Sequence, residues 1–171
     1  MMGLSVKICL AGLLLLLCAS GPVFGQTAKE RDEKDAILTA AENAFKFMRQ
    51  KNYAAIWDSL SASSRKTIIG DVMSASKKAG VTYTAEALYG DFETGGPNAA
   101  AYWNSVLTHF DPDMALEESK WAMGEISARE AQIVVLYRKS EKPAVLKMFK
   151  ENGAWKFGLK ESFGARSISP F

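Results

Sequence analysis

The sequence predicts an α+β fold in which N-terminal helices pack in the concave face of a C-terminal antiparallel β-meander. Over most of residues 28–110, apolar residues recur at helical spacing, whereas from Glu117 onward they follow a period of two. The pair Asn152-Gly153 is typical of a two-residue β-turn, in which both central residues have positive φ. These observations predict a series of helices followed by four strands.

The first 25 residues have the pattern of a secretory signal peptide. Lys7 precedes an apolar run over residues 8–17, and the small residue Gly25 marks the expected cleavage position. The run is shorter than the roughly 20 residues of a transmembrane helix. We therefore expect a periplasmic or secreted protein. Cys18 raises the alternative of a lipid anchor on a membrane, although Leu17 stands where a small residue should precede the modified cysteine.

Composition excludes several kinds of site. Both cysteines, Cys9 and Cys18, lie in the leader, so the mature chain has no disulfide, thiolate ligand or cysteine nucleophile. Lys and Arg (21) nearly balance Asp and Glu (19), and no basic stripe indicates nucleic-acid binding. We expect one domain over residues 26–163 with a helical insert around 64–112, and a flexible tail over residues 164–171.

The helices are expected in the following places. Thr27 and Glu30 form a capping box for the first. Its apolar stripe consists of Ile37, Leu38, Ala41, Phe45 and Met48. Asn52 caps a short second helix, and further helices are expected over residues 65–78 and 98–109. Between them, residues 81–96 show no clear period, and Thr84 is expected to cap one helical turn. Asp111-Pro112 predicts a turn.

The strands are expected at about residues 120–127, 131–138, 144–150 and 154–161. The Asn152-Gly153 turn sets a register that pairs Lys150 with Trp155, Met148 with Phe157, and Leu146 with Leu159. In this register one face is apolar, and Lys150 is an exception to it. The continuous apolar run of residues 133–136 predicts burial on both faces of the second strand, a surface that would also suit a homodimer.

Residues 52–61, NYAAIWDSLS, and residues 149–156, FKENGAWK, resemble the second helix and the last hairpin of the nuclear transport factor 2-like superfamily. The resemblance extends over residues 28–163, and the chain is similar to exported bacterial members of unknown function. It implies a cone-shaped fold with an apolar cavity between the concave sheet and the helices. The long helical insert between Ser64 and Pro112 departs from the family pattern.

The sequence contains few residues that could form a catalytic or metal-binding site. His109 is the only histidine, which excludes a site with two imidazoles. His109, Asp111 and Asp113 form an H-x-D-x-D pattern that could offer three metal ligands. A helix end followed by turn-forming aspartates is the better interpretation. Asp58 and Glu125, with Tyr137 as a donor, are candidates for acid–base chemistry, but charged side chains usually stay solvated. We expect no catalytic residues, no metal and no cofactor.

Large aromatic residues are the remaining signal. The candidate pocket residues are Trp57, Trp103, Trp121, Tyr137 and Trp155. Such residues more often fill a core, but they would line a pocket if the cone is incompletely filled. We expect an exported, non-enzymatic domain that binds a small apolar or aromatic ligand or a protein partner. The alternative is a small isomerase, dehydratase or hydrolase of the same superfamily that uses a buried carboxylate or His109.

Overall fold

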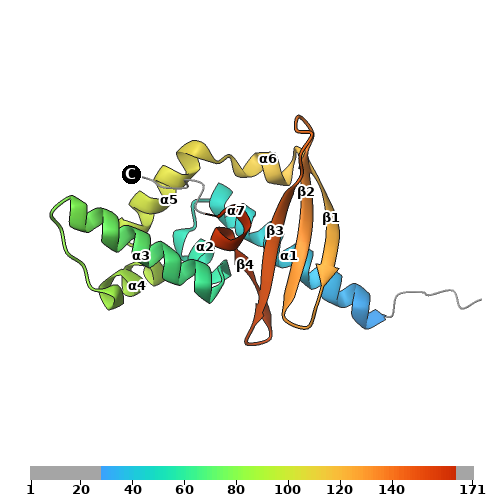
Figure 1. Ribbon diagram of the computed structural model, residues 1–171, viewed down its shortest axis with the longest axis horizontal. Coiled ribbons are helices and arrows are strands. Elements are labelled where there is room, and N and C mark those ends of the chain that lie inside the picture. The colour runs from blue at the N-terminus through green and yellow to red at the C-terminus, as the bar shows by residue number, and fades with distance from the viewer. Residues whose placement is uncertain (1–27, 165–171) are drawn as a thin grey trace, which may run out of the picture.

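The computed structural model describes residues 28–164 (Figure 1). Its helices are α1 (Ala28–Arg49), α2 (Tyr53–Ser59), α3 (Ala62–Lys78), α4 (Ala85–Thr94), α5 (Pro97–His109), α6 (Pro112–Leu116) and α7 (Leu159–Phe163). Its strands are β1 (Ser119–Ile126), β2 (Glu130–Tyr137), β3 (Ala144–Glu151) and β4 (Ala154–Gly158). The expected signal peptide, Thr27 of the expected capping box, and the expected tail after Gly164 lie outside the described residues.

The α+β class is confirmed. Six helices precede an antiparallel sheet with the strand order β1-β2-β3-β4, and the short helix α7 follows it within the described residues. Figure 1 shows the sheet at one end of the molecule and helices α2 to α5 gathered at the other, with α1 reaching from the sheet to α2. We call the group of α2 to α5 the helical lobe.

Helix α1 is stabilised by ion pairs on its solvent-exposed face and by burial of its apolar stripe. The expected pairs of Glu30 with Lys34 and of Glu42 with Lys46 are confirmed, at 3.4 and 2.8 Å between nitrogen and oxygen. The buried residues of the helix are Ile37, Ala41, Ala44, Phe45 and Met48. Four of the five residues of the expected apolar stripe are therefore buried, and the fifth, Leu38, is half-buried.

The helix caps explain where the other helices begin. Asn52 caps α2 as expected, because its side chain accepts a hydrogen bond from the Ala55 N–H at 3.2 Å. Ser61 caps α3, which therefore starts at Ala62, earlier than the sequence predicted. Thr84 caps a helix of ten residues, so the prediction of a single turn was wrong. Asp111 caps the short α6 in place of a simple turn.

The predicted hairpin register is confirmed near the turn and wrong at its far end. Lys150 pairs with Trp155 and Met148 with Phe157. The strand stops at Gly158, however, and Leu159 begins α7 instead of pairing with Leu146. The N–H of Lys147 on β3 donates to Ser162 Oγ of α7 at 2.8 Å. Helix α7 thus satisfies a strand donor that a longer β4 would have satisfied.

Strand β2 is buried on one face only, so the prediction of burial on both faces was wrong. Ile133 and Val135 are buried, whereas Val134 is half-buried and Leu136 is 39% exposed. The reason is that α1 and α6 pack on one face of the sheet, which we call the inner face. Val145 of β3 is exposed beside Val134 on the other, outer face.

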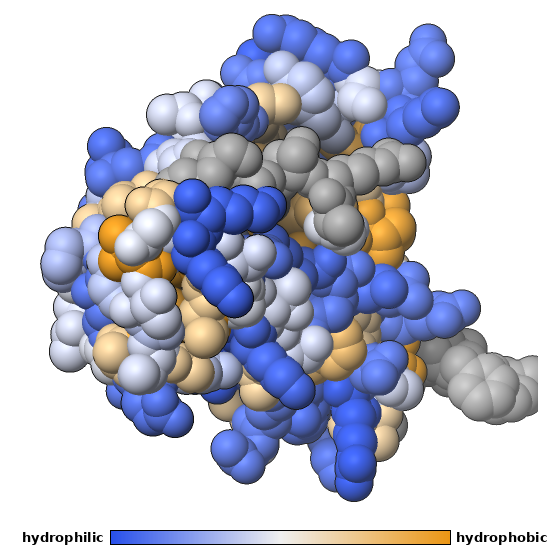
Figure 2. Space-filling view, turned by 60° about the vertical axis from the view of Figure 1, so that its left-hand side comes forward, coloured by the Kyte–Doolittle hydropathy of each residue, from blue (hydrophilic) through white to orange (hydrophobic). Residues whose placement is uncertain are grey.

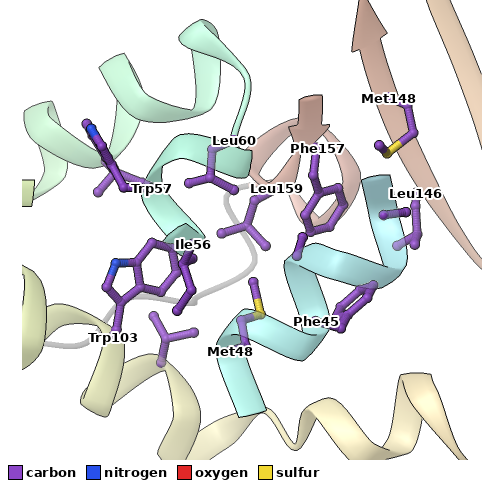
Figure 3. Close-up of a cluster of buried hydrophobic side chains, with 14 of the residues drawn as sticks. Phe45, Met48, Ile56, Trp57, Leu60, Trp103, Leu146, Met148, Phe157 and Leu159 are labelled. Carbon is purple, nitrogen blue, oxygen red and sulfur yellow. The ribbon is translucent and has the colours of Figure 1, made fainter. Parts of the chain in front are cut away.

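Phe45 fills the centre of the inner face. Its ring lies 5.7 Å from that of Trp121 on β1 and 5.5 Å from that of Phe157 on β4, between ring centroids. One side chain of α1 therefore contacts both edge strands. Figure 3 shows the packed cluster that continues from Phe45 and Met48 into the helical lobe. At this position the space that the resemblance assigned to a cavity is occupied by side chains.

Candidate functional site

Two of the expected pocket residues lie in the packed interior. Trp57 and Trp103 are 1% and 0% exposed. The Trp57 ring packs 4.7 Å from Phe92, and the Trp103 ring packs 5.0 Å from Tyr102 (Figure 3 shows both tryptophans in the cluster). Within residues 28–164, neither indole nitrogen has a hydrogen-bond partner. Both rings therefore act as core of the helical lobe.

Trp155 closes the inner face near the start of α1. Its indole N–H donates to Glu33 Oε1 at 2.8 Å, and Lys150 Nζ binds the same oxygen at 2.6 Å. The hydrogen bond from Lys150 is the main cause that lowers the pKa of Glu33, with the Trp155 bond adding to it against the opposing effect of burial. This contact explains why Lys150, an exception in the sequence pattern, lies on the apolar face.

Trp121 differs from the other tryptophans because it is only half-buried. Its indole N–H donates to the carbonyl of Ala115 at 2.8 Å, and its ring meets the edge of Phe45 at an interplanar angle of 82°. These two contacts fix the plane of the ring. Tyr137, the fifth candidate, is half-buried at the end of β2, opposite Ser119.

A hollow of about 500 Å³ lies beside Trp121, and we call it the Trp121 hollow. It is lined by Asp35, Leu38, Thr39, Glu42, Leu116 and Trp121. Four of these residues come from one face of α1, since their spacing is i, i+3, i+4 and i+7. Leu116 comes from α6 and Trp121 from β1. Three elements from distant parts of the chain therefore build this hollow.

The lining of the Trp121 hollow combines apolar walls with negative charge. Leu38, Leu116 and Trp121 supply the apolar surface, while Asp35 and Glu42 are exposed carboxylates. Lys46 pairs with Glu42 at 2.8 Å and offsets part of that charge. Such a site can bind a small apolar group and disfavours an anion.

The acid–base candidates are not buried, although Glu125 lines a hollow on the outer face of the sheet. Asp58, Glu125 and His109 are all exposed. The Asp58 carboxylate lies 3.3 Å from Lys156 Nζ, and His109 Nδ1 lies 2.8 Å from Thr108 Oγ1. None of these three residues is therefore the buried group that the enzymatic alternative needs.

The two aspartates of the H-x-D-x-D pattern make structural contacts. Asp111 accepts the N–H of Asp113, and Asp113 pairs with Arg49 at 3.2 Å. Across residues 28–164, no group of three or more His, Cys, Asp or Glu side chains is arranged to hold a metal ion. No helix in the same range is both long enough and apolar enough to cross a membrane.

Glu161 is a polar contact residue that sequence reasoning missed. It accepts a hydrogen bond from Ser61 at 3.1 Å and another from Ser64, and both serines are fully buried at the start of α3. Burial alone would raise the pKa of Glu161, but hydrogen bonds from Ser64, Ser63 and Ser61 outweigh it and lower the pKa. No sequence signal connects these residues, because they are about a hundred positions apart.

Comparison of the chain with known protein families, curated proteins and solved structures finds no match. The resemblance to the nuclear transport factor 2-like superfamily therefore stays a prediction. A functional assignment for this chain must come from the geometry of its own residues. The surface offers little further guidance, since on the face shown in Figure 2 hydrophilic residues surround small apolar patches.

Proposed function

We propose that the protein is an exported, non-enzymatic binding domain whose ligand places an apolar or aromatic group against Trp121. The observation that carries this proposal is the position of Trp121. Its ring is fixed by a hydrogen bond to Ala115 and is half-buried, and it forms one wall of a hollow. A rigid aromatic surface gives a ligand a large contact area, and little side-chain entropy is lost on binding because the ring is already fixed.

The volume and charge of the hollow narrow the ligand class. About 500 Å³ falls within the range of roughly 300–1,000 Å³ that is typical of small-molecule sites. The carboxylates of Asp35 and Glu42 favour a neutral or cationic ligand, and Thr39 offers a hydroxyl for one hydrogen bond. An apolar side chain of a protein partner is the alternative occupant of the same surface.

The resemblance to the nuclear transport factor 2-like superfamily is compatible with this proposal. A helix packed across one face of an antiparallel meander is the coarse arrangement that the superfamily implies. In such a cone, a central ligand would compete with Phe45. We therefore assign the ligand to the edge of the inner face, where Trp121 lies, instead of to its centre.

The binding role is preferred to the enzymatic alternative. An isomerase, dehydratase or hydrolase would need a proton-transferring group inside a cavity, where its pKa can be matched to the reaction. The three side chains considered for that role, Asp58, Glu125 and His109, are exposed. Asp58 and His109 contact Lys156 and Thr108, and Glu125 is solvent-exposed at the hollow that it lines on the outer face of the sheet.

The proposal includes export by the leader over residues 1–25, which is outside the described residues. N-terminal sequencing of the protein recovered from its own cell should give a chain that starts at Gln26. A lipid-modified N-terminus at Cys18, abolished by Cys18→Ser, would instead place the domain on a membrane.

Blocking the hollow tests the proposed function. The neutral aromatic probe N-phenyl-1-naphthylamine should gain fluorescence with the mature protein, and Thr39→Trp should weaken its binding at least tenfold. Thr39 is exposed on α1, so the added ring can occupy the hollow without disturbing the core. Thr108→Trp, at an exposed position of α5 outside the Trp121 hollow, is the matched control and should bind like the parent. No probe binding, or equal binding by Thr39→Trp, would contradict the proposal.

A further inference from the structure

The outer face of the sheet holds a second hollow, of about 700 Å³, which is separate from the Trp121 hollow on the inner side. Its polar lining includes Gln132 and Lys147 on the two central strands. Its acidic side chains are Glu125, Glu130 and Glu161. Phe149 supplies an aromatic ring. We call this the Phe149 hollow.

Two glycines on the edge strands flank Gln132 and Lys147, which line the Phe149 hollow. Gln132 pairs with Lys147, and Lys147 pairs with Gly158, so these residues form one row across β2, β3 and β4. Gly124 on β1 extends this row, because a Cβ built there would lie 3.1 Å from the Cβ of Gln132. The row therefore presents an amide and an ammonium in its middle, between two glycines that carry no side chain of their own.

The Phe149 ring is seated on the backbone of β4. A Cβ added to Gly158 would overlap Cε2 of the ring and would lie 3.0 Å from the carbonyl oxygen of Lys147. The glycine therefore allows the ring to lie close against the strand. Phe149 stays half-buried, and part of its surface lines the hollow. A flat apolar surface of fixed position results at one end of a polar site.

The charged and polar groups of the hollow disfavour an anion and suit a ligand that both donates and accepts hydrogen bonds. Lys147 is exposed and has no ion pair within residues 28–164, so its ammonium is available as a donor. Three carboxylates against one ammonium give the hollow a net negative charge, which repels an anion, while Lys147 opposes a cation only where that cation lies beside it. Glu161 already binds two serines, but a carboxylate has about four acceptor positions and can accept further bonds.

We propose that the Phe149 hollow binds a carbohydrate of one or two sugar rings. Hydroxyl groups of the sugar accept from Lys147 and Gln132 and donate to the surrounding carboxylates. The apolar C–H face of a sugar ring packs on Phe149. A volume of about 700 Å³ is sufficient for a disaccharide by comparison with the roughly 300–1,000 Å³ of small-molecule sites.

A lysine substitution with a matched control tests this site. Saturation-transfer NMR on the mature protein would use N,N′-diacetylchitobiose, maltose and cellobiose as probes. We expect at least one sugar to bind, and Lys147→Met to weaken it at least tenfold, because the ammonium is lost while the side-chain length is retained. Lys120→Met removes an exposed lysine from β1 outside the hollow and should bind like the parent. Matching thermal melting curves would show that both variants are folded.

Each other outcome overturns the inference. Binding of none of the three sugars contradicts the carbohydrate assignment, and so does Lys147-dependent binding of the zwitterion glycyl-phenylalanine in their place. A sugar that binds Lys147→Met as well as the parent contradicts the location. The Thr39→Trp variant should bind the sugar normally, so failure of the Trp121 proposal is distinguishable from failure of this one.

Discussion

The hydroxyl of Ser64 donates a hydrogen bond to the carboxylate of Glu161 and thereby joins the first turn of α3 to α7. Ser61 donates to the same carboxylate, and Ser64 Oγ accepts the backbone N–H of Lys160 at 3.0 Å. These bonds connect the helical lobe to the end of the sheet. Buried hydroxyl groups need hydrogen-bond partners, and Glu161 supplies them to both serines. We therefore expect this connection to stabilise the fold whether or not a ligand is bound.

Glu161 should make the folded state sensitive to acid. Its pKa is lowered in the folded protein, so its stabilising contribution is fully present above the ordinary glutamate pKa of about 4.3 and is lost as the pH falls through the lower folded-state pKa. Glu161→Gln should cost about 1–3 kcal/mol at neutral pH and should flatten this acid-dependent loss. Urea unfolding at several pH values measures both effects. Glu93→Gln, at an exposed position of α4, should keep the parent's pH dependence.

Gly96 and Asp91 should act as one unit in capping α5. The Asp91 carboxylate accepts the N–H of Ala99 at 2.7 Å, and a Cβ on Gly96 would lie 2.5 Å from Asp91 Oδ2. Gly96→Ala and Asp91→Ala should each cost about 1–2 kcal/mol by displacing or removing the cap. The double variant should cost clearly less than the two single effects together. Additive costs in the unfolding free energies would show that the residues act separately.

Glycine substitutions should have opposite effects in helices and in the hairpin turn. Gly70 and Gly90 are exposed in α3 and α4 with open space around them, so alanine should stabilise each helix by about 0.5–1 kcal/mol. Gly153 has a φ of 83° beside Asn152 at 50°, so Gly153→Ala should destabilise by about 1 kcal/mol. Thermal melting of the three variants checks the signs, and a stabilising Gly153→Ala would contradict the assigned turn.

Lys150 should control the ionisation of Glu33. The hydrogen bond from Lys150 is the main cause of the lowered pKa of Glu33, so Lys150→Met should raise that pKa toward its ordinary value. The Trp155 bond remains in the variant and keeps part of the effect. Carboxyl-detected NMR titration measures the change, and Lys147→Met on the outer face is the control. An unchanged Glu33 pKa in Lys150→Met would contradict the contact.

The hairpin could be predicted because its information is local. Asn152-Gly153 fixes the turn, and the alternation beside it fixes Lys150 opposite Trp155. The end of β4 was not predictable in this way. Whether residue 159 continues a strand or begins a helix depends on Ser64, which satisfies the Lys160 N–H from another element. The burial of β2 likewise depends on which faces other elements cover, so the run of residues 133–136 was misleading.

The candidate site was predictable in one residue only. Trp121 was one of five aromatic candidates, and nothing in the sequence distinguishes it from Trp57 or Trp103, which fill the core. The sequence did not predict that α1 lines the hollow. Asp35, Thr39 and Glu42 belong to a polar helix face, and such a face is usually exposed to solvent. Only the packing of α6 and β1 beside this face makes it part of a hollow.

Indole NMR signals give the most direct test of the binding proposal. The sequence holds four tryptophans, so a ¹⁵N-labelled mature protein should show four indole N–H signals. During titration with benzylamine, an aromatic cation, we expect the Trp121 signal to shift while those of the buried Trp57 and Trp103 stay fixed. A static Trp121 signal, or shifts at Trp57 and Trp103 instead, would contradict a ligand site beside Trp121.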